Sequence, residues 1–186
     1  TGDQIRLFLS DETFSKFSQQ EQTARAVTDL DIIYEDTDIL LINKPTGMLS
    51  QPDDTKEPSM VEYLIGYLLQ NGSLTEENLR TFHPSVCNRL DKNTSGIIAA
   101  GKSLAGLQEL SALFHDRTVH KDYLCIVKGK LTRSRHIRGY LHKDANLNKV
   151  SVSPTKEKDA QPIETQYTPI CNNEHATLLK VRLITG

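Results

Sequence analysis

Alternation of apolar and polar side chains predicts a hairpin and several further β-strands. The runs IIYE (32–35) and ILLINK (39–44) are rich in aliphatic residues and flank a polar Asp-Thr-Asp turn, a pattern that favours two paired strands. The run GIIAA (96–100) is a compact strand candidate, and PIETQYTPI (162–170) and HATLLKVRLI (175–184) alternate as strands do.

The segment KDYLCIV (121–127) alternates between two sets of side chains, both of them largely apolar. Successive side chains of a strand point to opposite faces of the sheet. One face carries Tyr123, Cys125 and Val127, and the other carries Leu124 and Ile126. We therefore expect a strand with two buried faces.

Two segments are predicted to be helices, each beginning after a serine. Ser59 precedes MVEYLIGYLLQ, which stops at Asn71-Gly72, and Ser103 precedes a second periodic segment. Serine favours the N-cap position because its side chain accepts a hydrogen bond from a free backbone N–H group. One side of the second helix carries Leu104, Leu107, Ser111 and Phe114.

The order of these elements predicts the fold class. Strands and helices do not alternate regularly, as they do in a parallel βαβ protein. We expect an α+β fold with a central mixed or largely antiparallel sheet and flanking helices. The region 130–160 is basic and polar, and we expect it to be rich in loops.

The chain is expected to contain two parts. Residues 1–30 begin with GDQIRLFL, a short strand candidate that would end a small unit, and continue as a polar, acidic linker. Residues 31–186 form the main domain. This domain ends on LITG, in what we expect to be the interior of a structural unit, so we expect it to be incomplete at its C-terminus.

The composition is that of an ordinary soluble protein, with 37% hydrophobic and 25% charged residues among 186. No apolar run approaches the roughly 20 residues that cross a bilayer, and the first residues lack the pattern of a secretory signal. We expect a cytoplasmic protein without membrane contacts. The three cysteines, which are odd in number and widely spaced, do not indicate a disulfide framework.

Charge is distributed unevenly along the chain, although the formal net charge is only −2. Residues 1–60 sum to −7, whereas residues 117–149 carry nine Lys/Arg against two Asp/Glu, a local charge of +7. Phosphate contacts depend on local charge, so this segment is a candidate for binding a polyanion. A solvated loop accounts for the same charges equally well.

A polar loop, residues 88–95, leads directly into the strand candidate at 96–100. Loops held by rigid strands often carry catalytic groups. If the segment is extended, Arg89 and Asp91 project to the same side, and the guanidinium favours the ionised carboxylate. An ionised carboxylate can act as a nucleophile. The alternative is a structural Arg–Asp pair that fixes the loop.

Other catalytic classes find little support. His83 and Cys87 are four residues apart, but Pro84 intervenes and no second pair with ligand spacing follows, so a zinc site is not indicated. The sequence contains neither a Gly-x-Ser-x-Gly elbow nor a Gly-rich Walker loop. A serine hydrolase and a P-loop nucleotide enzyme are therefore unsupported.

The stretch RLDKNTSGIIAAGKS resembles the Arg-Leu-Asp-x-x-Thr-Ser-Gly signature of RluA-type ribosomal RNA pseudouridine synthases. Segments on both sides resemble the family in the same order, from residue 31 to residue 186. They are IIYEDTDILLINKPTGMLSQP, ALFHDRTVHKDYLCIVKG, DAQPIETQYTPI and LLKVRLITG. The opening GDQIRLFL also resembles the last strand of a small N-terminal RNA-recognition domain.

The resemblance implies a pseudouridine synthase fold, with a cleft across a long mixed sheet, and a reaction that uses neither metal nor cofactor. It makes Asp91 the catalytic aspartate that attacks a flipped uridine. It pairs Arg89 with Asp91, places Tyr123 against the uracil ring and makes Ile184 part of the same pocket. These roles are implied by the matching motifs.

The implied partner is RNA. Ribosomal RNA is the expected substrate, and transfer RNA stays open as a second one. The enzyme must extrude the target base at a cost of about a few kcal/mol, and stacking on an aromatic ring returns about 1 to 3 kcal/mol. Phosphate contacts are expected from the basic segment, and a monomer is expected. The expected contacts are Arg117, Lys121, Arg133, Arg135 and Arg138.

The chain departs from the family pattern in three places. Asn88 stands where the family commonly has His, and Gly101 replaces a more usual alanine, but neither change touches the named roles. The serious departure is that the basic residue that follows Leu-x-Thr-Gly in the family has no counterpart after Gly186. We therefore expect the chain as written to be inactive or nearly so. Two other functions stay open, a non-catalytic RNA-binding module of the same fold and a purely structural interaction domain.

Overall fold

A computed structural model gives the fold, and it describes residues 29–55, 57–144, 149–156 and 159–185. The strand and most of the linker predicted for residues 1–30 lie outside the described residues. The chain divides after Ser111 into two compact units, which we call unit 1 and unit 2. Each unit is described by itself, and the domain boundary predicted at residue 31 stays a prediction.

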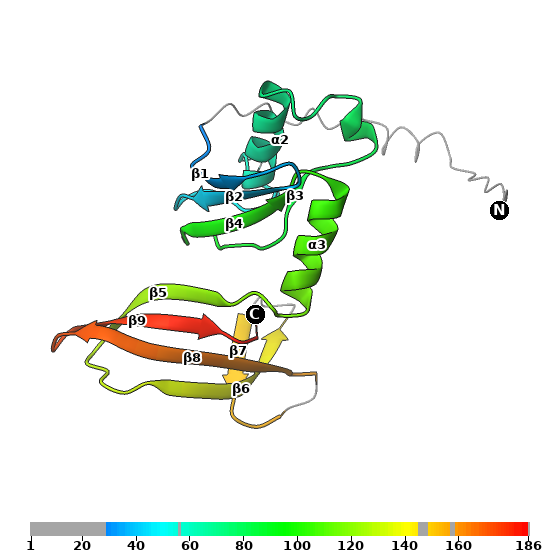
Figure 1. Cartoon of the computed structure of the whole chain (residues 1–186). Coiled ribbons are helices and arrows are strands. Elements are labelled where there is room, and N and C mark those ends of the chain that lie inside the picture. The colour runs from blue at the N-terminus through cyan, green and yellow to red at the C-terminus, as the bar shows by residue number, and fades with distance from the viewer. Residues whose placement is uncertain (1–28, 56, 145–148, 157–158, 186) are drawn as a thin grey trace. The chain divides into compact units, whose positions relative to one another are not determined.

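Unit 1 contains a four-stranded sheet in which every strand pair is antiparallel (Figure 1). The spatial order is β1-β2-β4-β3. The strands are β1 (Ile32–Glu35), β2 (Ile39–Lys44), β3 (Ser85–Val86) and β4 (Gly96–Gly101). The predicted hairpin is confirmed, because β1 pairs with β2 and the N–H group of Asp36 donates to the carbonyl of Ile39 at 3.1 Å.

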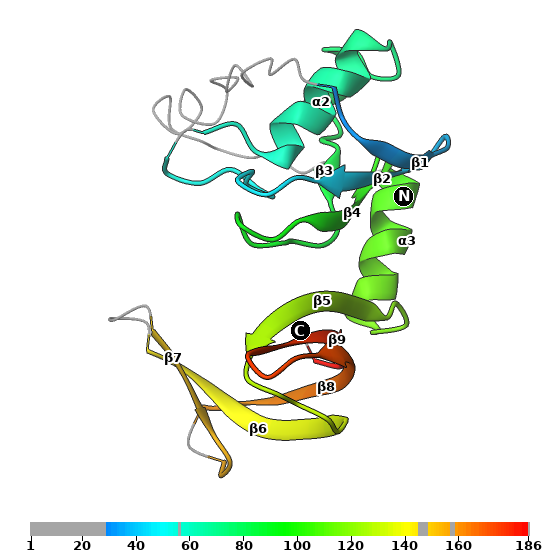
Figure 2. The ribbon, with the colours of Figure 1, turned by 90° about the vertical axis from the view of Figure 1, so that its left-hand side faces the viewer.

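Helix α2 (Met60–Gln70) lies over one face of this sheet (Figures 1 and 2). Ser59 is its N-cap residue, as predicted, and the Glu62 carboxylate accepts a hydrogen bond from the backbone N–H of Ser59. The helix ends before Asn71-Gly72, where Gly72 adopts φ +77°. A short 3-10 helix, Asn78–Arg80, follows.

The core of unit 1 lies between α2 and the sheet. Opposite residues of β2 and β4 contribute apolar side chains in register, with Leu40 facing Ala100 and Ile42 facing Ile98. The helix contributes Met60, Leu64, Ile65 and Leu68, all of them buried. Burial of these side chains from water stabilises the unit.

Helix α3 (Leu104–His115) also begins after its predicted serine. The Ser103 hydroxyl oxygen accepts a hydrogen bond from the N–H of Gly106 at 3.1 Å. The residues on the predicted apolar side differ in burial, because Leu104 is 56% exposed whereas Leu107 and Phe114 are partly buried. The helix is most buried at Gly106 and Leu110. Gly106 approaches the backbone of Asp38 closely, which only a glycine permits.

Unit 2 contains a five-stranded antiparallel sheet in the order β5-β9-β8-β6-β7. The strands are β5 (Lys121–Lys128), β6 (Arg135–Asp144), β7 (Lys149–Ser153), β8 (Gln161–Asn172) and β9 (Ala176–Leu183). Strands β6 and β7 form a hairpin (Figure 2). The expected loop-rich region at 130–160 is therefore wrong, because cross-strand hydrogen bonds order its polar residues.

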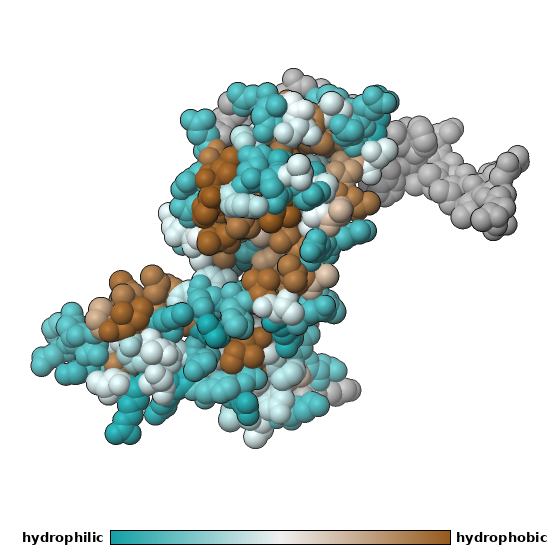
Figure 3. All heavy atoms as spheres, in the orientation of Figure 1, coloured by the Kyte–Doolittle hydropathy of each residue, from teal (hydrophilic) through white to brown (hydrophobic). Residues whose placement is uncertain are grey.

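The expectation of two buried faces on β5 is also wrong. Tyr123, Cys125 and Val127 are partly buried, but Leu124 is 70% exposed and Ile126 is 76% exposed. Figure 3 shows apolar surface over part of β5. Alternation alone determines which side chains share a face, and it does not determine what covers that face.

The predicted α+β class is confirmed, with antiparallel strand pairs throughout the described elements except for an isolated parallel bridge between Leu49 and Ser59. Among the helices of the described residues, none has the length and apolarity that a membrane span requires.

Candidate active site

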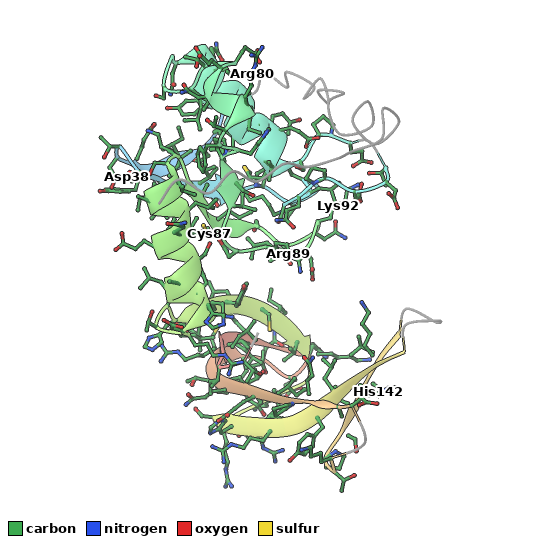
Figure 4. The ribbon with its side chains drawn as sticks, turned by 90° about the vertical axis from the view of Figure 1, so that its right-hand side faces the viewer. Asp38, Arg80, Cys87, Arg89, Lys92 and His142 are labelled. Carbon is green, nitrogen blue, oxygen red and sulfur yellow. The ribbon has the colours of Figure 1, made fainter. Side chains whose placement is uncertain are left out.

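The predicted catalytic loop connects β3 to β4 in unit 1. A turn closes it, in which the N–H of Thr94 donates to the carbonyl of Asp91 at 2.9 Å. Leu90 is buried, whereas Arg89 and Asp91 on either side of it are exposed. An extended segment gives such an alternation, and the projection of both charged side chains to the same side stays a prediction. Figure 4 shows Arg89 and Lys92 projecting from the loop.

A buried serine holds the backbone of this loop. The Ser50 hydroxyl donates to the carbonyl of Leu90 at 2.6 Å and accepts from the N–H of Leu90 at 2.9 Å. Ser50 is only 5% exposed. One side chain therefore satisfies both polar groups of the residue between Arg89 and Asp91.

A buried lysine holds the next part of the loop. Lys44, with 0% exposure, donates from Nζ to the carbonyls of Pro45 at 3.0 Å, Met48 at 2.8 Å and Lys92 at 3.3 Å. The N–H of Gly47 donates to the same Lys92 carbonyl at 2.7 Å. The segment from Lys44 to Ser50 therefore supports the catalytic loop at several points, and we call it the supporting segment.

Lys44 also interacts electrostatically with the predicted nucleophile. Burial lowers the pKa of Lys44, and the negative charge of Asp91 acts in the opposite direction. Asp91 is thus within electrostatic range of a cation other than Arg89.

Asn88 supports the other side of the loop. Its side-chain amide donates to the carbonyl of Ile97 at 3.0 Å and its side-chain oxygen accepts from the N–H of Ala99 at 2.8 Å. Both partners belong to β4. The residue that departs from the family pattern therefore fastens the start of the loop to the adjacent strand.

The predicted pairing of Arg89 with Asp91 stays a prediction. Within the described ranges of the chain, no hydrogen bond or ion pair joins the two side chains. The nearby Lys92 forms an ion pair with Glu57, in which its Nζ lies 2.6 Å from a carboxylate oxygen. The guanidinium of Arg89 is exposed.

Sequence reasoning missed both Lys44 and Ser50. A signal for Lys44 was present, because Leu40, Ile42 and Lys44 alternate along ILLINK and all three are buried. Nothing local indicated Ser50, whose partner Leu90 lies 40 residues away in the sequence.

Three of the remaining predicted residues belong to unit 2. Tyr123 is opposite Val181 in the pairing of β5 with β9, and Lys121 is opposite Leu183. Ile184 follows directly after β9, where its N–H donates to the carbonyl of Glu164 at 3.1 Å. Asp91 and Arg89 belong to unit 1, so their predicted approach to Tyr123 stays a prediction.

The predicted phosphate-binding residues differ in their surroundings. Arg117 follows α3 with φ 57° and is exposed, as are Arg133 and Arg135. Arg138 forms an ion pair, with Nη2 and Nε each 3.1 Å from one carboxylate oxygen of Glu164. Arg135 and Arg138 project from opposite faces of β6, because they are three positions apart in the strand.

Two acidic residues of the unit 2 sheet contact basic side chains. The hydrogen bond from Arg182 lowers the pKa of Asp122 to about 2, and Lys180 adds to this effect. Burial raises the pKa of Glu164, but Arg138 and His136 outweigh it and the net shift is downward. Both carboxylates are therefore ionised partners of neighbouring cations.

In the part of the chain that the structure describes, no group of three or more His, Cys, Asp or Glu side chains is placed to bind a metal ion.

Comparison with known proteins identifies the family. A family profile for RNA pseudouridylate synthases matches residues 38–186. The chain belongs to the RNA pseudouridylate synthase family. The loop that carries Asp91 and the sheet that carries Tyr123 both lie inside the matched residues, and the resemblance found in the sequence is confirmed.

Similar curated proteins include bacterial ribosomal RNA enzymes. The chain is 31% identical to ribosomal large subunit pseudouridine synthase D of Borreliella burgdorferi, over 97% of this chain and 56% of that protein. It is 31% identical to ribosomal large subunit pseudouridine synthase C of Vibrio parahaemolyticus, over 83% of this chain and 45% of that protein. The chain spans about half the length of the curated relatives it matches.

Two solved human structures share the fold. The human RNA pseudouridylate synthase domain containing 1 protein superimposes with a TM-score of 0.65 at 18% identity, over 87% of this chain and 62% of that chain. The human domain containing 4 protein gives a TM-score of 0.63 at 20% identity, over 83% and 59%. The pseudouridine synthase fold is thereby confirmed.

Proposed function

We propose that this protein isomerises uridine to pseudouridine in structured RNA, with large-subunit ribosomal RNA as its substrate. Membership of the family supports the reaction, and the names of the bacterial relatives support the substrate. The observation that carries the proposal is the loop of Arg89 and Asp91, whose backbone is held by buried Ser50 and Lys44.

Asp91 acts as the nucleophile in this proposal. Isomerisation breaks the bond between the ribose and a uracil nitrogen and forms a bond to a uracil carbon. The proton that leaves this carbon is matched by one gained at the nitrogen, so no atom or electron is added or lost. A carboxylate held at a fixed position lowers the barrier by attacking the flipped nucleotide.

The other predicted residues assist this step. Tyr123 receives the flipped uracil against its ring, and Ile184, which follows the strand paired with β5, adds an apolar wall. Arg89 occupies the space left by the base and interacts with Asp91. These roles rest on the matching motifs, and the exposure of Arg89 and Asp91 is compatible with access of a large RNA.

The decisive variant is Asp91→Asn in the intact protein. Turnover should fall below about one per cent of the parent, because loss of a covalent nucleophile costs several kcal/mol in the barrier. RNA affinity should stay within a few-fold. Asp54→Asn is the matched control, since Asp54 is also an exposed aspartate of unit 1. Retained turnover in Asp91→Asn would remove the nucleophile from this account.

A non-catalytic RNA-binding module is the competing function. It predicts RNA binding with no pseudouridine in ribosomal or transfer RNA, whatever the variant. Mapping pseudouridines in both RNAs, with and without the intact protein, separates the two functions and identifies the substrate. The cytoplasmic location and the monomeric state stay predictions.

Tyr123→Ala tests the aromatic contact. If Tyr123 supports the uracil, the variant loses turnover by far more than its melting temperature falls. If the ring is only a packing residue, activity and stability decline in proportion. Thermal unfolding and turnover measured on the same preparation distinguish these results.

A further inference from the structure

Strand register divides the side chains of the unit 2 sheet between two faces. Directly opposite residues of paired strands point to the same face. Tyr123 of β5 is opposite Val181 of β9, Val181 is opposite Tyr167 of β8, and Tyr167 is opposite Arg135 of β6. A single row across four strands therefore presents two tyrosines and an arginine on one face, which we call the tyrosine face.

The opposite face, which we call the ion-pair face, carries the paired acids of the sheet. Asp122 is opposite Arg182, and Glu164 is opposite Arg138. Both carboxylates contact their opposite cations, with Nε–Oδ1 at 2.9 Å for Arg182 and Nη2–Oε1 at 3.1 Å for Arg138. The arginines of this face are therefore engaged within the sheet.

The tyrosine face has the opposite electrostatic character. Among the paired strand residues that the structure describes on this face, the charged ones are all cations, and none is acidic. These cations are Lys121, Arg135 and Lys143. Arg135 is exposed and forms no ion pair within the described residues. The face therefore combines aromatic rings with uncompensated positive charge, the two features that bind single-stranded nucleic acid.

We propose that the tyrosine face binds a single-stranded RNA segment, with Tyr167 stacking on a nucleotide next to the target uridine and Arg135 contacting its phosphate. This inference rests on the proposed function in one respect, that Tyr123 receives the uridine. Neighbouring strands lie about 4.8 Å apart, so Tyr123 and Tyr167, which are separated by β9, lie roughly 10 Å apart along the row. Each ring can therefore take its own base.

Burial fits this role for Tyr167. Tyr167 and Tyr123 are both partly buried, whereas Arg135 at the end of the row is exposed. A partly buried ring keeps a fixed orientation while part of its surface stays accessible, which lowers the entropic cost of stacking. The phosphate contact is left to the flexible, exposed arginine.

The unit 2 sheet offers matched controls on its other face. Tyr167→Leu is compared with Tyr140→Leu, because Tyr140 lies in β6 on the ion-pair face. Arg135→Gln is compared with Arg138→Gln for the same reason. Binding of a fluorescent single-stranded oligouridine to the full chain is measured over a range of salt concentrations.

The expected results differ between the two faces. Tyr167→Leu weakens binding roughly tenfold, and Tyr167→Phe, which keeps the ring, restores affinity to within about twofold of the parent. Arg135→Gln lowers the slope of log affinity against log salt by about one, whereas Arg138→Gln changes it by less. Equal effects of Tyr140→Leu and Tyr167→Leu, or of the two arginine variants, would overturn the proposal.

A cross-linking experiment tests the same contacts without any substitution that could disturb folding. An oligouridine with one 5-iodouridine is irradiated with the unmodified chain, and the linked peptides are identified by mass spectrometry. Linkage to Tyr123 and Tyr167 supports the proposal, and linkage confined to Tyr140 overturns it. Equal affinity for polyglutamate also overturns it, because stacking would then contribute nothing.

These outcomes are separable from those of the proposed function. Oligouridine binding requires no turnover and is measured equally well in Asp91→Asn. If pseudouridine forms but Tyr167→Leu binds normally, the tyrosine face is wrong and the enzyme assignment stands. If Tyr167→Leu weakens binding but no pseudouridine forms in any RNA, the enzyme assignment fails and the binding face stands.

Discussion

Units 1 and 2 bury their side chains to very different extents. The structure gives fourteen buried hydrophobic residues in its described part, and all of them except Leu179 lie in unit 1. Unit 1 packs α2 against a four-stranded sheet, whereas unit 2 exposes Leu124 and Ile126 on the ion-pair face of β5. The larger sheet therefore has the smaller core.

This difference shows that the two units are stabilised by different interactions. Burial of apolar surface dominates in unit 1. Strand pairing and cross-strand ion pairs, such as Asp122 with Arg182, contribute a larger share in unit 2. The same difference suits the proposed roles, since a packed core fixes the loop of Asp91 and an open sheet offers a surface to RNA.

Removing a core side chain from unit 1 tests the comparison most strongly. Leu64 is fully buried in α2, so Leu64→Ala should lower the free energy of unfolding by about 2 to 5 kcal/mol. Leu124→Ala in unit 2 is the control and should change it by no more than about 0.5 kcal/mol. Urea unfolding measures both, and similar losses would mean that the exposed face of β5 is covered in solution.

A second variant tests how tightly α3 packs. A Cβ atom at Gly106 would lie 2.2 Å from the carbonyl oxygen of Asp38. Helix propensity alone predicts that Gly106→Ala stabilises the protein by about 1 kcal/mol. We expect the opposite sign, a loss of about 1 to 3 kcal/mol in the free energy of unfolding, because the backbone at Asp38 must move to admit the new methyl group. Thermal unfolding decides between the signs, and a stabilised variant would show that the close contact is absent.

The third variant separates the supporting segment from the loop it holds. Ser50→Ala leaves the N–H and the carbonyl of Leu90 without their partner, which costs about 1 to 3 kcal/mol. If the hydroxyl fixes Asp91, kcat of the intact protein should fall more than KM changes. Ser73→Ala, at an exposed serine of unit 1 outside this loop, should leave both unchanged. A rise in KM alone would mean that Ser50 affects binding instead.

The smallest expected effect is on the stability of unit 2 at acidic pH. The pKa of Asp122 falls from its ordinary value of 3.8 to about 2 in the folded chain, chiefly through Arg182. The ion pair therefore stabilises the sheet above pH 3.8, and this contribution is lost as the pH falls towards 2. Asp122→Asn should flatten the dependence of the melting temperature on pH in this range. An unchanged dependence would exclude Asp122 as its source.

The sequence predicted the parts of the fold that depend on local patterns. The hairpin of β1 and β2, the start of α2 after Ser59 and the strands β8 and β9 all follow from periodicity and turn residues. The α+β class followed from their order. The family resemblance, carried by the Arg-Leu-Asp loop, added the expected roles of Asp91 and Tyr123.

The features that sequence reasoning missed depend on contacts between distant segments. Exposure of Leu124 was missed because a strand pattern does not state what packs on it. Strand β6 was missed because its polar and basic residues hide a regular alternation between the two faces. The close approach of α3 to Asp38 was missed because Gly106, the residue in contact, has no side chain to signal it.

The interaction between the supporting segment and the catalytic loop has a consequence for the order of folding. The hydrogen bond between Ser50 and Leu90 closes a span of 40 residues, and that between Lys44 and Lys92 closes 48. Contacts between residues so far apart in the sequence form late in folding, because the chain between them must lose conformational entropy before the contact stabilises the fold. During synthesis the ribosome must release Leu90 and Lys92 before either contact can form. The loop should therefore assemble when the unit 1 sheet is complete. In pulsed hydrogen exchange during refolding, the Leu90 amide should become protected at the same time as the amides of β4 and later than those of α2.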